Sequence, residues 1–129
     1  MLVVEDELLL ALELSDMVED AGCAVLGPAP TVEEALSVLA GARPAAALLD
    51  ENLDGASVLP VARELARRGV PFAIVSGYVR SISDEPLLRG ARRLGKPPSP
   101  RQIREVLADL LARSPRGEPR AGSGDDNGL

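Results

Sequence analysis

Short apolar segments alternate along this chain with longer amphipathic ones, and this alternation limits the fold more than any other feature. Residues 2–4, 24–26, 45–49 and 72–75 are apolar throughout and predict strands, and residues 91–95 predict an edge strand. Strands without polar positions are typical of a sheet covered on both faces, as parallel sheets are. Strands alternating with helices and joined by right-handed crossovers therefore predict an α/β fold, with a doubly wound five-stranded parallel sheet and helices on both faces.

The amphipathic segments carry signals for helix starts. Thr31 and Glu34 have the spacing of a capping box, and so do Ser99 and Gln102. Pro60 falls in the first turn of another predicted helix, where a missing N–H costs little. The predicted helices cover residues 7–22, 31–40, 57–68 and a final segment that begins after Ser99. Residues 77–90 predict a loop with up to one turn of helix.

The composition changes at Ser114. Residues 114–129 hold four glycines and two prolines, and their apolar side chains are only Ala121 and Leu129. Such a segment cannot bury enough apolar surface to fold. We therefore expect one domain over residues 1–113 and a disordered C-terminal tail over residues 114–129.

Charge and residue content exclude several classes of function. The net charge of −6 disfavours direct nucleic acid binding, which needs a basic surface. The chain has no histidine, so a metal site here must be built from oxygen ligands. Cys23 is the single cysteine, which excludes an internal disulfide and predicts a small buried residue. No segment resembles a signal peptide or a membrane span, so we expect no membrane contact and a cytoplasmic location.

Chemically capable residues stand at the carboxyl ends of the predicted strands, where ligands bind in open α/β sheets. Glu5 and Asp6 follow the first strand, and Asp50 follows the third. Ser76 follows the fourth strand, and the fifth leads into Lys96. Any one of these could be a solvated loop residue, but their joint placement predicts a site.

Three neighbouring carboxylates repel one another, and a hard divalent cation relieves this repulsion. Mg²⁺ suits the position because it binds one or two carboxylates together with waters and a phosphate oxygen. A carboxylate can accept a phosphoryl group covalently, a lysine ammonium can pair with phosphoryl oxygens, and a serine hydroxyl can donate to them. Phosphoryl transfer depends mainly on positioning and charge neutralisation, so it needs no histidine.

Taken together, these motifs resemble the receiver domain of two-component response regulators. The resemblance covers residues 1 to about 113 and rests on the segments 2–7, 48–55, 75–78 and 95–97. It implies the flavodoxin-like strand order 2-1-3-4-5. It also implies that Asp50 is the phosphoacceptor, with Ser76 and Lys96 acting on the phosphoryl group.

The resemblance also implies a metal site and a cis peptide bond. Asp6 and Asp50 would bind Mg²⁺ directly, Glu5 would act through a metal-bound water, and Asn52 would offer its backbone carbonyl. The bond between Lys96 and Pro97 would be cis.

The chain departs from the receiver pattern at the position three residues before the lysine. Receivers often have an aromatic residue there, and this chain has Arg93. Tyr78 is a candidate replacement as a switch residue, since Ser76-Gly77-Tyr78 resembles a subclass of stand-alone receivers with a Thr-Gly-Tyr signature. We expect Arg93 to lie with Arg92 on an exposed, charged sheet edge.

Two further acidic residues follow the acceptor closely. Glu51 and Asp54 are interpreted as solvated loop carboxylates that add negative field near the metal without binding it.

The function that follows is a signalling receiver, not an enzyme. It would take a phosphoryl group from a histidine kinase or phosphotransfer protein, hydrolyse its acyl phosphate slowly, and change contacts with an unidentified protein target or a second copy of itself. One alternative is a docking module that works without phosphorylation, and another is a Mg²⁺-dependent aspartyl phosphatase. A phosphatase of that kind needs an acid two residues after the nucleophile, where this chain has Asn52. A nucleotide-binding domain would need a glycine-rich loop after the first strand, which Glu5-Asp6-Glu7 does not provide.

Overall fold

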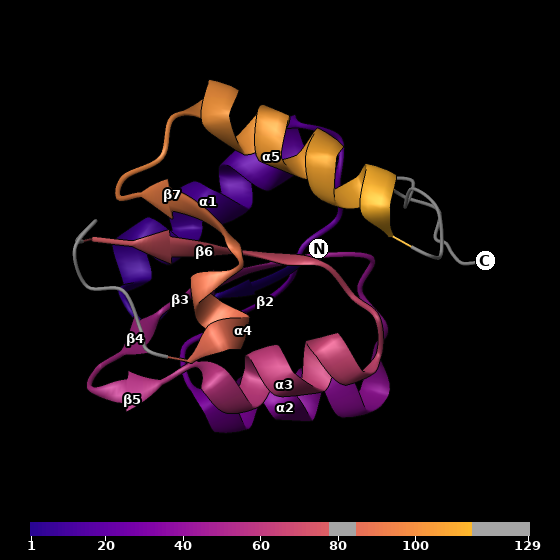
Figure 1. The fold of residues 1–129 in the computed structure, drawn as a ribbon. Helices are drawn as coiled ribbons and strands as arrows, with labels where there is room; N and C mark the ends of the chain where they lie inside the picture. Colours follow the sequence, from indigo (N-terminus) through magenta and orange to yellow (C-terminus); the bar gives the residue numbers. More distant parts are fainter. Residues whose placement is uncertain (78–84, 115–129) are drawn as a thin grey trace.

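A computed structural model describes residues 1–77 and 85–114 of the chain. Its main sheet has five parallel strands in the order β2-β1-β3-β6-β7 (Figure 1). The strands are β1 (Leu2–Val4), β2 (Leu26–Ala29), β3 (Ala47–Asp50), β6 (Phe72–Ser76) and β7 (Arg92–Gly95). Counted along the main sheet alone, this is the order 2-1-3-4-5, so the predicted fold class is confirmed.

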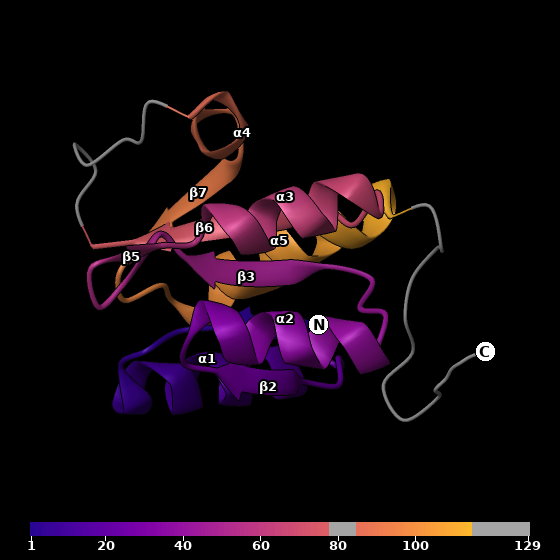
Figure 2. The ribbon, with the colours of Figure 1, turned by 90° about the horizontal axis from the view of Figure 1, so that it is seen from below.

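Helices cover both faces of the sheet. They are α1 (Leu8–Asp20), α2 (Val32–Gly41), α3 (Leu59–Arg67), α4 (Pro86–Arg89) and α5 (Pro100–Arg113). Helices α1 and α5 lie on one face, and α2 and α3 lie on the other (Figures 1 and 2). Each face has its own aliphatic core: Val3 and Leu48 pack with α1 and α5, while Leu49 and Ile74 pack with α2, α3 and α4. Cys23 is buried in the first of these cores, as the sequence predicts.

The two predicted capping residues are confirmed, whereas the helix predicted from residue 57 begins at Leu59 because Ser57 is part of β5. Thr31 Oγ1 accepts a hydrogen bond from Glu34 N at 3.1 Å, which begins α2. Ser99 and Gln102 form a complete capping box at the start of α5. Proline occupies the first turn of α3, as expected for Pro60.

The second strand lies later in the chain than the apolar pattern indicates. The sequence places it at residues 24–26, ended by Gly27-Pro28, whereas β2 includes both of these residues. The prediction was wrong because β2 is an edge strand, where a proline without an N–H is tolerated. Gly27 has φ +96, and a Cβ there would lie 2.7 Å from the backbone nitrogen of Ala29, so this conformation needs glycine.

A small hairpin occupies a segment predicted to be a loop. It consists of β4 (Asn52–Leu53) and β5 (Ala56–Ser57), which pair antiparallel. Asp54 and Gly55 join them, both with positive φ, and Asp-Gly favours such a two-residue turn. The weakly alternating polar sequence gave no strand signal.

Helix α4 is a single turn, in agreement with the prediction for residues 77–90. Residues 78–84, including Tyr78, and residues 115–129, which make up the predicted tail apart from Ser114, lie outside the described residues. Within the two described ranges, no helix has both the length and the apolar character needed to cross a membrane.

Candidate functional site

The strand ends bring the predicted site residues to one edge of the sheet. Asp50 ends β3 and is in register with Val75 of β6, and Ser76 ends β6 in register with Gly95 of β7. Glu5 directly follows β1, the other neighbour of β3, and Lys96 directly follows β7.

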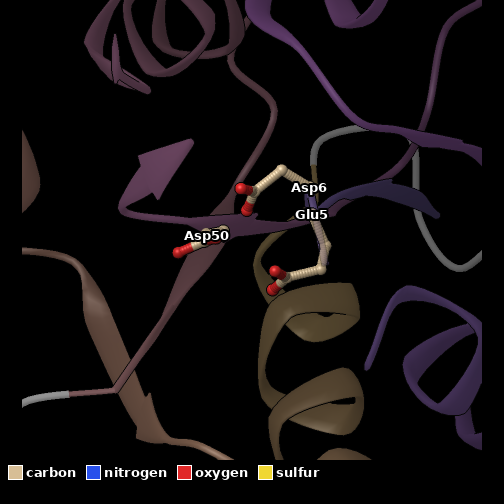
Figure 3. Close-up of side chains that lie close together, drawn as sticks. All are labelled: Glu5, Asp6 and Asp50. Carbon is tan, nitrogen blue, oxygen red and sulfur yellow. The ribbon is translucent and has the colours of Figure 1, made fainter. Parts of the chain in front are cut away.

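Three carboxylates form the centre of this edge. One carboxylate oxygen from each of Glu5, Asp6 and Asp50 lies within 4.8 Å of the others (Figure 3). Glu5 is 1% exposed and Asp50 is 4% exposed, although both are acidic. Such burial is costly for charged groups unless a cation compensates it.

Lys96 supplies part of that compensation. Its Nζ lies 3.2 Å from Asp50 Oδ2 and 3.3 Å from Glu5 Oε1. Burial opposes the charged form of Lys96, but the negative charges of Asp50 and Glu5 outweigh it and raise the pKa of the ammonium. The backbone N–H of Lys96 donates to the Ser76 carbonyl at 3.1 Å, which fixes the position of Lys96. The bond between Lys96 and Pro97 is cis, as the resemblance implies.

The environment of Asp50 favours its protonated form in the absence of a metal. Burial, a hydrogen bond with Asp6 and the charge of Glu5 raise the pKa of Asp50 from 3.8 to about 7. The Lys96 ammonium and the Asn52 N–H, which donates to Asp50 Oδ1 at 3.2 Å, act in the opposite direction. A carboxyl in this state gains its charge readily when a further cation arrives.

The donor set fits a hard divalent cation. Within the described part of the chain, Glu5 Oε1 and Asp50 Oδ2 are buried and have no hydrogen-bond partner besides their ion pairs with Lys96. Three carboxylates face a single ammonium, so negative charge remains in excess at this edge. Oxygen ligands and excess negative charge are what Mg²⁺ requires.

The structure gives the positions of the other predicted site residues, and their roles stay predictions. Ser76 is buried at the end of β6, beside the strand that carries Asp50. Asn52 contacts Asp50 through its backbone N–H, while its side chain accepts a hydrogen bond from Gly55 N at 2.7 Å. Metal binding by the Asn52 carbonyl stays a prediction, as does the role of Tyr78.

Sequence reasoning missed one largely buried ion pair. Glu51 was expected to be solvated and Arg93 to be on an exposed edge, but their side chains are only 12% and 19% exposed and their charged groups lie 2.6 Å apart. Both expectations were wrong because each charge compensates the other. The expectation of an exposed edge holds for Arg92, which pairs with Asp109 at 3.1 Å, and Asp54 is exposed as predicted.

Known structures share this fold. SdrG from Sphingomonas melonis Fr1 is 36% identical, with 85% of this chain and 93% of that chain covered and a TM-score of 0.74. The receiver domain of the PhyR response regulator from Erythrobacter litoralis is 23% identical, with 99% and 94% covered and a TM-score of 0.78. With its strand order and its acidic edge, the chain belongs to the receiver domains of response regulators.

The chain is also similar in sequence to a curated regulator protein. The phyllosphere-induced regulator PhyR of Methylorubrum extorquens is 31% identical over 113 residues, which is 85% of this chain. The chain spans 42% of the length of that relative. No protein-family model matches the chain.

Proposed function

We propose that residues 1–113 form a two-component signalling receiver that accepts a phosphoryl group on Asp50, with Mg²⁺, and changes its protein contacts as a result. One observation carries this proposal. A buried carboxylate at the end of β3 lies 3.2 Å from a lysine ammonium and within 4.8 Å of oxygens from two further carboxylates. This arrangement provides an acceptor, a phosphoryl-binding cation and a metal site at one position.

The transfer would proceed by attack of an Asp50 carboxylate oxygen on the phosphorus of a phosphohistidine. The new O–P bond forms as the P–N bond breaks, and the electron pair remains on the leaving imidazole nitrogen. Asp6 and Asp50 would hold Mg²⁺ directly and Glu5 through a metal-bound water, and the ion would neutralise charge on the phosphoryl oxygens. Attack of water on the same phosphorus would later return Asp50 and free phosphate, which would be a slow self-dephosphorylation.

Two residues of the chain would act on the phosphoryl group itself. Lys96 would pair with a phosphoryl oxygen, since its ammonium is already beside Asp50 Oδ2. Ser76 would donate its hydroxyl to another oxygen and move toward Asp50 as the switch turns on. Asp50 must be ionised to attack, and because its pKa is raised to about 7, a bound cation would favour the reactive form.

The partner would be a histidine kinase or a phosphotransfer protein, and α1 offers it a docking surface. Leu8, Leu9 and Leu12 are 73%, 67% and 49% exposed in the first half of this helix. Exposed apolar clusters mark interaction sites. Helix α1 begins two residues after Asp6, so a protein bound there would stand next to the acceptor.

The proposal is tested by incubating the protein with Mg²⁺ and acetyl phosphate and measuring intact mass. We expect a gain of one phosphoryl group that requires Mg²⁺ and is absent in Asp50→Asn. Asp54→Asn, which changes an exposed carboxylate in the neighbouring turn, is the matched control and should retain the gain. No gain with acetyl phosphate or with a phosphorylated protein donor would favour the docking module that works without phosphorylation.

A further inference from the structure

Arg93 connects three parts of the molecule. It lies on β7, its Nη1 donates to Glu51 Oε1 at 2.6 Å, and its Nη2 donates to the Leu88 carbonyl of α4 at 3.3 Å. Glu51 is the residue directly after Asp50. The planar guanidinium can hold two such acceptors at once in a fixed geometry, which an ammonium does poorly.

The ion pair is more than a surface contact. Exposed salt bridges contribute little, but Glu51 and Arg93 are both largely buried. If one partner were removed, the other would lose a close opposite charge in a largely buried setting. The positions of the Glu51 and Arg93 side chains therefore depend strongly on each other.

Arg93 lies on the face of the sheet that also carries the serine. It is in register with Ile74, and side chains alternate along β6, so Ile74, Ser76 and Arg93 share a face. Ile74 packs in the core that includes Leu88 of α4. A movement of Ser76 toward Asp50 would thus occur on the side of the sheet where Arg93 makes its contacts.

A continuous set of contacts leads from the acceptor to this ion pair. Asp50 Oδ1 accepts a hydrogen bond from Asn52 N at 3.2 Å, and the Glu51 carbonyl between them accepts one from Val58 N at 3.3 Å. A phosphoryl group on Asp50 changes the charge and the acceptors at one end of this segment. The Glu51 side chain is attached to the same segment.

Helix α4 is well suited to respond. It has only four residues, Pro86–Arg89, and leads directly into β7 (Figure 2). Leu88 is its buried anchor, and the carbonyl of the same residue accepts the hydrogen bond from Arg93. A one-turn helix has few internal hydrogen bonds, so tertiary contacts set its position.

We propose that Arg93 is a positioning residue that couples the phosphorylation state of Asp50 to the position of α4, through its ion pair with Glu51 and its hydrogen bond to Leu88. This rests on the proposed function, since it requires Asp50 to be the acceptor.

The test uses the full chain labelled for NMR, with beryllofluoride as the phosphoryl mimic. Amide shifts of Leu87, Leu88 and Arg89 report on α4, and those of Asn52 and Lys96 report on the site. In the parent, adding beryllofluoride to the Mg²⁺-loaded protein should shift both sets. In Arg93→Gln and in Glu51→Gln, the response at Asn52 and Lys96 should remain and the response in α4 should be lost.

Matched control variants distinguish a loss of coupling between Asp50 and α4 from a general loss of structure. Arg92→Gln removes a neighbouring arginine whose partner, Asp109, lies on α5, and it should retain the α4 response. The double variant Glu51→Gln/Arg93→Gln should lose no more than either single variant, because the pair acts as one unit. Glu51→Gln leaves Arg93 a neutral acceptor, so it serves if Arg93→Gln does not fold.

The outcomes are distinct. If beryllofluoride shifts neither set in the parent, the proposed function fails. If the site responds but α4 keeps its response in both single variants, or loses it equally in Arg92→Gln, the coupling role of Arg93 is overturned. It is also overturned if Tyr78→Ala abolishes the α4 response while Arg93→Gln retains it.

Discussion

The ammonium of Lys96 lies 3.2 Å from Asp50 Oδ2, although 46 positions separate the two residues in the sequence. Lys96 is also the only lysine of the chain, so its charge at this edge cannot be supplied by another lysine nearby. The backbone hydrogen bond from Lys96 to Ser76 fixes this lysine at the end of β7. Because the Lys96 ammonium lies beside Asp50, replacing Lys96 should change the pKa and the reactivity of this carboxylate.

Replacing Lys96 with Met should raise the pKa of Asp50 further and slow phosphorylation by acetyl phosphate. The ammonium favours the ionised carboxylate, and the uncharged side chain does not. Carboxyl-carbon NMR titration of Asp50 measures the first effect, and intact mass against time measures the second. Lys96→Arg retains the charge and should change the pKa less; an unchanged pKa in Lys96→Met would contradict the assignment.

In the metal-free protein, the contribution of Asp50 to the free energy of unfolding should fall as the pH rises from 3.8 to about 7. The folded state binds the Asp50 proton more tightly than the unfolded chain, so it is favoured below the folded pKa and loses this advantage as the proton leaves. Asp50→Asn removes the titration and should be more stable than the parent above pH 7, by on the order of 4 kcal/mol.

Urea unfolding of both proteins across this pH range measures the effect. Glu64 contributes with the opposite sign, because hydrogen bonds from Arg67 and Arg68 lower its pKa to about 2. It does so equally in both proteins, so the difference between them isolates Asp50. Saturating Mg²⁺ should reduce the difference, and a difference that does not depend on pH would refute the account.

Replacing each of the two acidic residues that follow β1 should lower the affinity for Mg²⁺ by a different amount. Asp6→Ala should abolish Mg²⁺ binding, whereas Glu5→Ala should only weaken it, because Glu5 is buried beside Lys96 and is expected to act through a water. Titration calorimetry measures both affinities. Asp16→Ala on α1 is a control that should bind as the parent does, and equal affinities for Asp6→Ala and the parent would exclude Asp6 as a ligand.

The exposed apolar surface of α1 should affect the rate of phosphoryl transfer from a protein donor but not from a small-molecule donor. Leu9→Asp places a charge among the exposed leucines and should lower the rate of transfer from a phosphorylated histidine protein by about tenfold or more. Phosphorylation by acetyl phosphate should be unchanged. Light scattering on the parent distinguishes a second copy of the chain as the occupant, and equal rates from the protein donor would rule out this surface as its docking site.

The sequence predicts the strand ends well because parallel strands all end at one edge, so residues 5, 6, 50, 76 and 96 must meet there. It fails at β2 because Gly27 and Pro28 carry turn signals that an edge strand can override. It fails for Glu51 and Arg93 because their strands are not adjacent and only the reach of two long side chains brings the charges together. Two charged residues that are largely buried because they pair with each other leave no periodic pattern in the sequence.

The central claim is that Asp50 carries the phosphoryl group, and locating that group tests it most directly. After reaction with acetyl phosphate and Mg²⁺, borohydride reduces an aspartyl phosphate to the alcohol of homoserine, and peptide mass spectrometry then identifies the residue. The account predicts homoserine at position 50 alone, formed only when Mg²⁺ is present. Homoserine at position 6 or 54, the five-carbon alcohol 5-hydroxynorvaline at position 51, or phosphate retained on a serine would contradict it.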